Sequence, residues 1–154
     1  KTAALFSAAT EVGGVIADAP EDQIKALFDY GDALGIAFQI VDDLLDYRGT
    51  DATGKNIGDD FRERKLTLPV IKAVALADDE ERAFWQRTIE KGKQDDGDLD
   101  HALSLLAKHK TLEATEADAR GWAEQAKVAL DALPNSDLKN MLGDIADYVV
   151  SRIS

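Results

Sequence analysis

Residues 38–46 read Phe-Gln-Ile-Val-Asp-Asp-Leu-Leu-Asp, which places three carboxylates in an otherwise apolar run. A helix advances by about 100° per residue, so the three aspartates and Gln39 fall within one arc of about 100°. Apolar side chains occupy most of the remaining circumference. The pattern predicts a helix with one narrow polar strip that is walled by hydrophobic residues on both sides.

Two glycines precede this strip on the same side of the expected helix. Gly35 lies about two turns before the acids and Gly31 about three turns before them. Since glycine has no side chain to fill space, the sequence predicts room above the acids. We therefore expect the strip to line a polar cavity.

A solvated acidic face is the alternative interpretation of the three aspartates. Surface helices usually spread their charges broadly and pair acids with Lys or Arg one turn away, yet no cation lies between Lys25 and Arg48. Acids this close repel one another, and a divalent ion removes the repulsion by binding their oxygens. Because Mg²⁺ uses one or two carboxylates together with substrate phosphates, the spacing favours a magnesium site over the solvated cluster.

The stretch that follows, residues 48–64, is predicted to be a loop because it is rich in Gly, Thr and Asn. Lys55 lies within it, and Arg62, Arg64 and Lys65 close it. Carboxylates with bound metal on one side and cations on the other suit a diphosphate group. The loop also nearly matches the nucleotide-binding P-loop, but Asn56 replaces the required hydroxyl and a helix, not a strand, precedes it.

Three segments resemble the trans-polyprenyl diphosphate synthases, in the order that this family has them. Residues 35–47 and 54–69 are similar to the second aspartate-rich region, and Lys1-Thr-Ala-Ala-Leu-Phe6 resembles the Lys-Thr segment that precedes it. The matched part runs from Lys1 to about Val70. The resemblance implies an all-α fold, the isoprenoid-synthase helical bundle.

The resemblance also implies a metal site. Asp42, Asp43 and Asp46 would bind Mg²⁺, with Asp42 the most direct ligand. Asp60 would assist through a metal-bound water.

A diphosphate site is implied beside the metal. Gln39 would face the allylic diphosphate, and Lys1, Lys55 and Lys65 would contact it, with Thr2 alongside.

In this interpretation the catalytic residues are Asp42, Lys55 and Gln39. The implied reaction condenses an allylic diphosphate with isopentenyl diphosphate in a homodimeric, cytoplasmic transferase. Overall likeness suggests a long-chain product such as octaprenyl diphosphate. One departure is Arg64, where many relatives carry Gly before the lysine; a cation there is compatible with phosphate handling.

The first aspartate-rich motif of the family is absent from the sequence. The pairs at 59–60, 78–79 and 95–96 all lack the third aspartate that Asp-Asp-x-x-Asp requires. The chain also begins at Lys1 without Met. We therefore expect residues 1–154 to be a single helical region, the C-terminal half of a longer synthase, whose missing partner is the N-terminal half.

Composition agrees with a helical protein and excludes several partners. Ala, Leu, Glu, Lys and Asp dominate, which favours helix, and 45% of the residues are hydrophobic. A net charge of −12 argues against nucleic acid and anionic membranes as partners. The absence of cysteine agrees with a reducing cytoplasm, and neither an 18-residue apolar stretch nor a signal peptide is present.

Hydrophobic periodicity and capping residues predict roughly seven helices. Their expected ranges are 1–17, 21–47, 67–77, 78–92, 98–109, 113–133 and 136–150. Two other interpretations stay open: a non-catalytic partner subunit of a prenyl synthase, and a helical interaction protein with a solvated acidic face.

Overall fold

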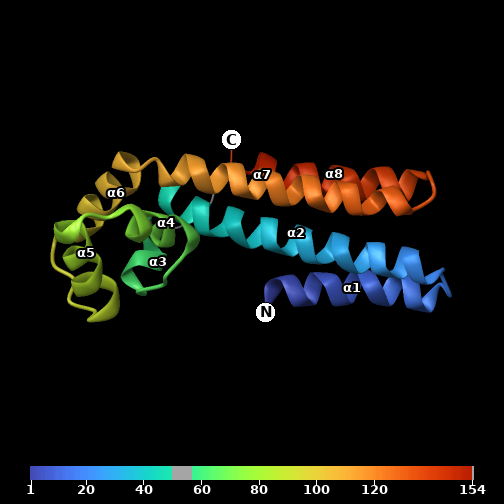
Figure 1. Cartoon of the computed structure of the whole chain (residues 1–154), viewed down its shortest axis with the longest axis horizontal. Helices are drawn as coiled ribbons and strands as arrows, with labels where there is room; N and C mark the ends of the chain where they lie inside the picture. Colours follow the sequence, from blue (N-terminus) through green and yellow to red (C-terminus); the bar gives the residue numbers. More distant parts are fainter. Residues whose placement is uncertain (50–56, 154) are drawn as a thin grey trace. The chain divides into compact units, whose positions relative to one another are not determined.

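A computed structural model describes residues 1–49 and 57–153, and within these ranges the chain contains helices and no strand (Figure 1). This confirms the all-α prediction. None of the described helices is both long enough and apolar enough to cross a membrane. The elements are α1 (Thr2–Ile16), α2 (Glu21–Arg48), α3 (Asp59–Arg62), α4 (Leu68–Leu76), α5 (Asp79–Trp85), the π-helix η1 (Gln86–Glu90), α6 (Asp98–Lys108), α7 (Thr111–Ala129), the 3₁₀ turn η2 (Leu130–Ala132) and α8 (Asp137–Ser151).

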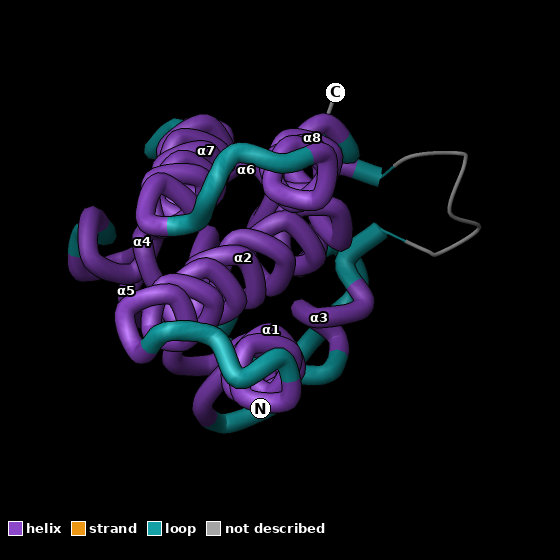
Figure 2. The backbone as a smooth tube through the Cα atoms, turned by 90° about the vertical axis from the view of Figure 1, so that its right-hand side faces the viewer, coloured by secondary structure: helices purple, strands orange, loops and turns teal. Residues whose placement is uncertain are grey.

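The chain divides into two compact units, and α2 runs through both. Unit 1 comprises Lys1–Val41 and Ala117–Ser154, and unit 2 comprises Asp42–Glu116. In unit 1, α2 lies between α1 on one side and the α7–α8 pair on the other (Figures 1 and 2). The buried Tyr30 of α2 donates a hydrogen bond to the carbonyl of Leu142 in α8 at 2.8 Å.

Close contact between α1 and α2 depends on glycine. A Cβ atom added to Gly35 would lie 2.6 Å from the Cα of Ala3, and one added to Gly31 would lie 2.7 Å from the Cα of Ser7. The backbone of α1 therefore fills the space in which the sequence predicted a cavity. The prediction that these glycines leave open room above the acids is wrong, because they admit a neighbouring helix.

Unit 2 is built around an aromatic core. The ring of Phe61 lies 6.5 Å from that of Phe84 and 6.4 Å from that of Trp85, and Phe61 is 1% exposed. Phe61 belongs to α3, a short helix within the stretch 48–64 that the sequence predicted to be loop throughout. That prediction is wrong at 59–62: Gly58, with φ of 81°, turns the chain into α3, and burial of Phe61 stabilises the turn.

The helix expected at 78–92 changes geometry within its length. α5 ends at Trp85, and η1 continues it as a π-helix to Glu90. Thr88 is fully buried there, and its hydroxyl donates to the carbonyl of Phe84 at 2.9 Å. Trp85 is a core residue at 3% exposed.

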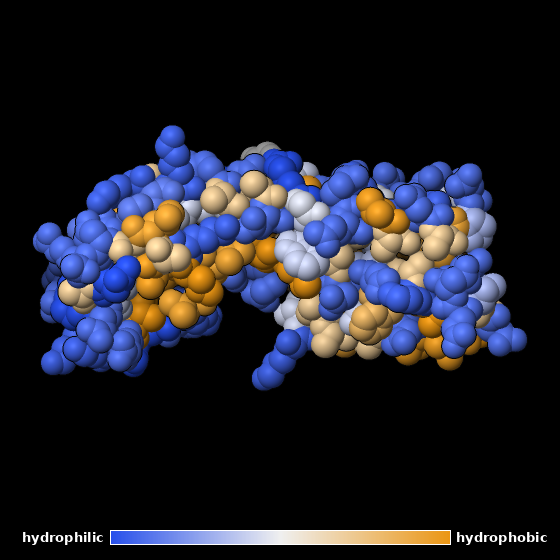
Figure 3. Space-filling view, in the orientation of Figure 1, coloured by the Kyte–Doolittle hydropathy of each residue, from blue (hydrophilic) through white to orange (hydrophobic). Residues whose placement is uncertain are grey.

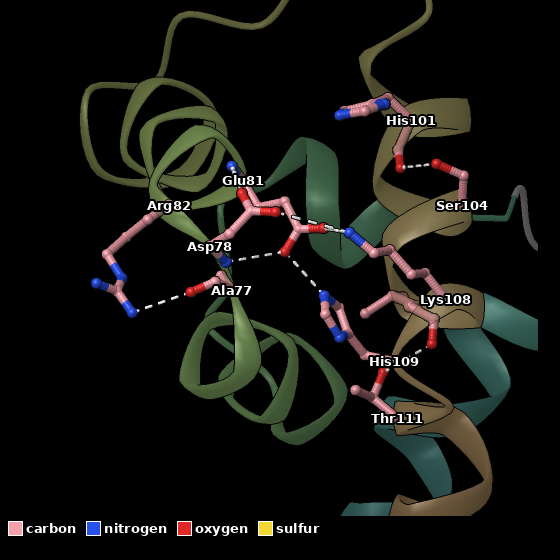
Figure 4. A network of polar contacts seen from close by, with 10 residues as sticks. Ala77, Asp78, Glu81, Arg82, His101, Ser104, Lys108, His109 and Thr111 are labelled. Carbon is pink, nitrogen blue, oxygen red and sulfur yellow. Dashed lines mark hydrogen bonds and ion pairs between the residues drawn. The ribbon is translucent and has the colours of Figure 1, made fainter.

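A buried glutamate connects α5 with the end of α6 (Figure 4). Glu81 is 6% exposed and forms a capping box with Asp78, because each side chain accepts a hydrogen bond from the other's backbone N–H. Its carboxylate also binds Lys108 and, at 2.8 Å, Nε2 of His109. Hydrogen bonds from Lys108 and then His109 lower the pKa of Glu81 to about 2. Asp78 thus caps α5, where the sequence predicted a helix to begin.

We expect Gly35→Ala to destabilise the chain. Its new methyl group would meet the backbone of α1, which cannot move aside as a flexible side chain could, so the expected loss is about 1–3 kcal/mol. Gly121→Ala is the matched control, because a Cβ there meets nothing within 4 Å and should stabilise α7 by about 0.5–1 kcal/mol. Urea unfolding measures both; equal effects of the two substitutions would contradict the packing role of Gly35.

Glu81→Gln should reduce stability in a pH-dependent way. The folded pKa of about 2 lies below the ordinary glutamate value of about 4.3, so the carboxylate stabilises the fold fully above about pH 4.3 and progressively less toward pH 2. The urea midpoints of wild type and variant should therefore converge as the pH falls from about 5 toward about 2. The neighbouring exposed Glu80→Gln serves as control, and a gap for Glu81→Gln that is independent of pH would refute this assignment.

Candidate functional site

The three acids of α2 occupy different environments. Asp42 is exposed, whereas Asp43 and Asp46 are partly buried. The intervening Leu44 and the following Tyr47 are 0% and 4% exposed. The predicted polar strip beside buried apolar residues is therefore confirmed, and Asp42 is the exposed one of its three acids.

Asp46 holds the beginning of α3. Its Oδ2 accepts the backbone N–H of Asp60 at 3.1 Å, and its main-chain carbonyl accepts the N–H of Gly58 at 2.9 Å. Burial raises the pKa of Asp46; the hydrogen bond from the Asp60 N–H opposes this, and the charges of Asp60 and Asp59 add to it. The carboxylate of Asp46 is thus hydrogen-bonded to the backbone at the start of α3.

Asp43 has a similar relation to α4. Its Oδ2 accepts the N–H of Leu68, the first residue of α4, across a long contact of 3.4 Å. Thr67 is the N-cap and Pro69 lies in the first turn of the helix that the sequence predicted at 67–77, but the Thr67 side chain makes no capping bond. Its hydroxyl instead donates to the Tyr47 hydroxyl at 3.4 Å. The carboxylate of Asp43 therefore takes the place of the missing side-chain cap.

Lys65 is already in an acidic environment. Its ammonium group lies 2.7 Å from Glu63 Oε2 and 2.9 Å from Asp60 Oδ1, while 54% of its side chain stays exposed. Hydrogen bonds to Glu63 and then to Asp60 raise the pKa of Lys65 above its ordinary value. The structure thus brings together Asp46, Asp60 and Lys65, which the sequence predicted to share one site.

Arg64 has a role that the sequence did not reveal. Its backbone adopts φ of 61°, the left-handed conformation in which glycine is favoured. Its guanidinium donates to the carbonyls of Ile89 at 3.0 Å and Glu90 at 2.8 Å, in the π-helix η1. The left-handed conformation of Arg64 and the contact of its side chain with η1 both depend on the folded structure. These two bonds direct the Arg64 guanidinium toward η1.

Unit 1 contains the other part of the predicted set. Thr2 donates from its hydroxyl to Oε1 of Gln39 at 3.1 Å. Lys1 is the exposed N-cap of α1. The structure therefore brings the opening segment next to Gln39, as the resemblance implied.

The described residues contain only part of the predicted site. Lys55 lies outside the residues that the structure describes. Within 1–49 and 57–153, no three His, Cys, Asp or Glu side chains form a group that could hold a metal ion by itself.

Comparison with known proteins identifies relatives along the whole chain. The polyprenyl synthetase family model matches residues 1–106. The octaprenyl diphosphate synthase of Haemophilus influenzae is 40% identical over 153 residues, which are 99% of this chain and 46% of that protein. The octaprenyl diphosphate synthase of Escherichia coli is 37% identical with similar coverage.

Solved structures of the same kind superpose closely. A decaprenyl diphosphate synthase from Rhodobacter capsulatus is 71% identical with a TM-score of 0.94, covering 100% of this chain and 48% of its own. A polyprenyl synthase from Caulobacter crescentus, complexed with calcium and isoprenyl diphosphate, is 44% identical with a TM-score of 0.88, covering 97% of this chain and 46% of its own. The chain thus spans about half the length of the relatives it matches.

Substitutions of the acids should separate their structural contributions. Asp46→Ala removes the acceptor of the Asp60 N–H and should cost about 1–2 kcal/mol. Asp46→Asn keeps an acceptor and removes a charge that burial disfavours, so it should be near wild type. Asp42→Ala, at an exposed position, should change stability by less than about 0.5 kcal/mol. Urea unfolding without added metal tests all three; equal losses for Asp42→Ala and Asp46→Ala would contradict the assigned roles.

Proposed function

The chain belongs to the polyprenyl synthetase family, and on this premise we propose that it is one half of a prenyltransferase. The intact enzyme condenses an allylic prenyl diphosphate with isopentenyl diphosphate and makes a longer trans-polyprenyl diphosphate. The observation that carries the proposal is the acid strip of α2. One carboxylate is left accessible there, while the other two hold the segments that carry Asp60 and Lys65.

The donor set fits Mg²⁺. Asp42, Asp43 and Asp46 supply only oxygen atoms, which this hard cation requires, and few of them, which leaves coordination positions for diphosphate and water. In the proposed site Asp42 would hold the ion most directly, and Asp60 would assist from the neighbouring segment through water. When bound, the ion stabilises the negative charge that develops on the departing diphosphate.

The chain's own residues then bind and orient the allylic diphosphate. Lys1, Lys55 and Lys65 neutralise its oxygens, with Thr2 alongside, and Gln39 faces it. Lys65 already lies beside Asp60, so a diphosphate would exchange one anionic partner of the ammonium group for another.

The proposed reaction breaks the carbon–oxygen bond of the allylic diphosphate and leaves an allylic carbocation. The double bond of isopentenyl diphosphate attacks this cation, and loss of a proton to the released diphosphate completes one elongation. Because water would quench the cation, the site has to be dry. The buried Leu44 and Tyr47 beside the acids contribute to that requirement.

The product is proposed to be long. The relatives include octaprenyl and decaprenyl diphosphate synthases at 40% and 71% identity. We further propose a homodimeric enzyme of the cytoplasm. These proposals concern the intact protein, of which this chain spans about half.

A non-catalytic partner subunit is the second candidate. The observation that favours it is the half-length match, since a chain of this kind would act only together with a polypeptide that carries the other acidic motif. Mixing experiments distinguish the two.

We predict that residues 1–154 alone do not elongate farnesyl diphosphate with radiolabelled isopentenyl diphosphate and Mg²⁺. Activity should appear when the chain is mixed with the part of the R. capsulatus synthase that it does not match, and Asp42→Ala should lower it by at least about 100-fold. Turnover by the chain alone would refute the half-site. A mixture whose activity is unaffected by Asp42→Ala would favour the non-catalytic partner subunit.

Ligand binding gives an independent test. Mg²⁺ with inorganic diphosphate should raise the melting temperature of the wild-type chain and have a much smaller effect on Asp42→Ala. An unchanged melting temperature in the wild type would favour a solvated acidic face.

A further inference from the structure

Helix α1 is apolar around most of its circumference. Its 15 residues, Thr-Ala-Ala-Leu-Phe-Ser-Ala-Ala-Thr-Glu-Val-Gly-Gly-Val-Ile, include one charged side chain, Glu11. Helices of this composition are normally covered on all sides, because an exposed helix carries a charged or polar face. The composition of α1 therefore calls for a second neighbour in addition to α2.

One side of α1 packs against α2, and the opposite side is bare. Thr10 donates from its hydroxyl to the carbonyl of Leu27 at 2.6 Å, and the ring of Phe6 lies 5.5 Å from that of Phe38. We call the bare side the outer face of α1; its exposed members are Ala4, Leu5, Ala8, Ala9, Val12, Gly13, Val15 and Ile16. Figure 3 shows hydrophobic side chains along this edge of unit 1. Leu5 and Ile16 are 71% and 81% exposed.

The pair Gly13–Gly14 distinguishes the two sides. A Cβ on Gly14 would contact Leu27 at 3.0 Å and Ile24 at 3.2 Å, so close packing within the chain explains this glycine. A Cβ on Gly13 would meet nothing within 4 Å. Glycine in a helix interior costs about 1 kcal/mol relative to alanine, and nothing in the described chain offsets that cost at Gly13. Close approach of another backbone would offset it.

An equally open glycine on α7 has a different setting. A Cβ added to Gly121 would also meet nothing within 4 Å, but the exposed neighbours of this glycine are mostly polar: Arg120, Glu124 and Gln125, with Ala117 one turn before it. That side of α7 is mainly polar and suits water. Open space at a glycine therefore indicates a partner only where the surrounding face is apolar, as it is on α1.

We propose that the outer face of α1 binds a helix from the half of the synthase that this chain does not span. This inference rests on the proposed function and identifies the surface that joins the two halves. The relatives of matching fold are about twice as long as this chain, so an equal length of polypeptide is available to cover the face. Small residues at Ala9 and Gly13, one turn apart, let that helix approach closely.

Other occupants fit this face less well. Membrane-surface helices carry Lys and Arg beside their apolar side, whereas α1 contains neither and the chain has a net charge of −12. A second copy would bring two such charges together. One side of a helix roughly 22 Å long also offers much less than the ~800 Å² per partner of a standard interface.

The test uses the full chain and, as probe, the part of the R. capsulatus decaprenyl diphosphate synthase that lies outside the matched segment. Gly13→Leu should raise the melting temperature of the chain alone by about 2–4 °C, because leucine favours helix and has room there. The same substitution should weaken binding to the probe by at least about tenfold, because the side chain obstructs close approach. Gly121→Leu is the matched control and should leave binding within about twofold.

A second pair of variants tests the face without glycine. Val12 and Val128 are exposed helical valines of unit 1, at 51% and 59%. Val12→Glu should weaken binding to the probe, whereas Val128→Glu should not. Calorimetric titration measures the affinities, and sedimentation of the chain alone reports self-association.

Opposite effects of Gly13→Leu on stability and binding support the proposal. Unchanged binding of Gly13→Leu and Val12→Glu overturns it, as does a dimer of the chain that Val12→Glu dissociates without affecting the probe. Binding is measured apart from turnover. A tight but inactive complex would therefore refute the proposed function alone, and turnover that is insensitive to Gly13→Leu would refute this surface alone.

Discussion

Mutual repulsion of three carboxylates on α2 is the constraint on which unit 2 depends. No cation lies between Lys25 and Arg48 in the sequence to relieve it. The structure relieves part of it with backbone N–H groups, since Asp46 accepts from Asp60 at 3.1 Å. The acids that repel one another are thus also hydrogen-bond acceptors for the backbone at the starts of α3 and α4.

The same acids that stabilise the fold of unit 2 also belong to the proposed site. Asp43 and Asp46 face the starts of α4 and α3, where backbone N–H groups are unsatisfied and favour negative charge. The chain between those two points carries Lys65, whose position follows from them. Asp42 is exposed, and no neighbouring element is built on its carboxylate among the contacts described above.

Much of this could be predicted from the sequence because the signals are local. Thr67 followed by Pro69, Asp78 followed by Glu81, and Ser136 each begin a helix where capping chemistry requires it. Hydrophobic periodicity gave the extent of α2 to within one residue. The acid strip was equally local, since its angular width depends only on helical geometry.

The missed features depend on contacts between segments far apart in sequence. α3 forms because Phe61 is buried against Phe84 and Trp85, which composition around Gly58 could not indicate. The two hydrogen bonds of the Arg64 guanidinium similarly require the carbonyls of Ile89 and Glu90, which lie far away in the sequence. Hydrophobic periodicity shows which residues share one face of a helix. It does not show which other segment packs against that face.

Glycine shows this limit most sharply. In the sequence, Gly31, Gly35 and Gly13 look alike. Each lies inside a predicted helix, and each lowers the stability of that helix relative to alanine. The structure separates them: the backbone of α1 occupies the space beside Gly31 and Gly35, whereas no atom of the described residues lies within 4 Å of a Cβ added to Gly13. A helical glycine on an apolar face therefore indicates that something comes close, and only the surrounding structure tells whether that neighbour belongs to the same chain.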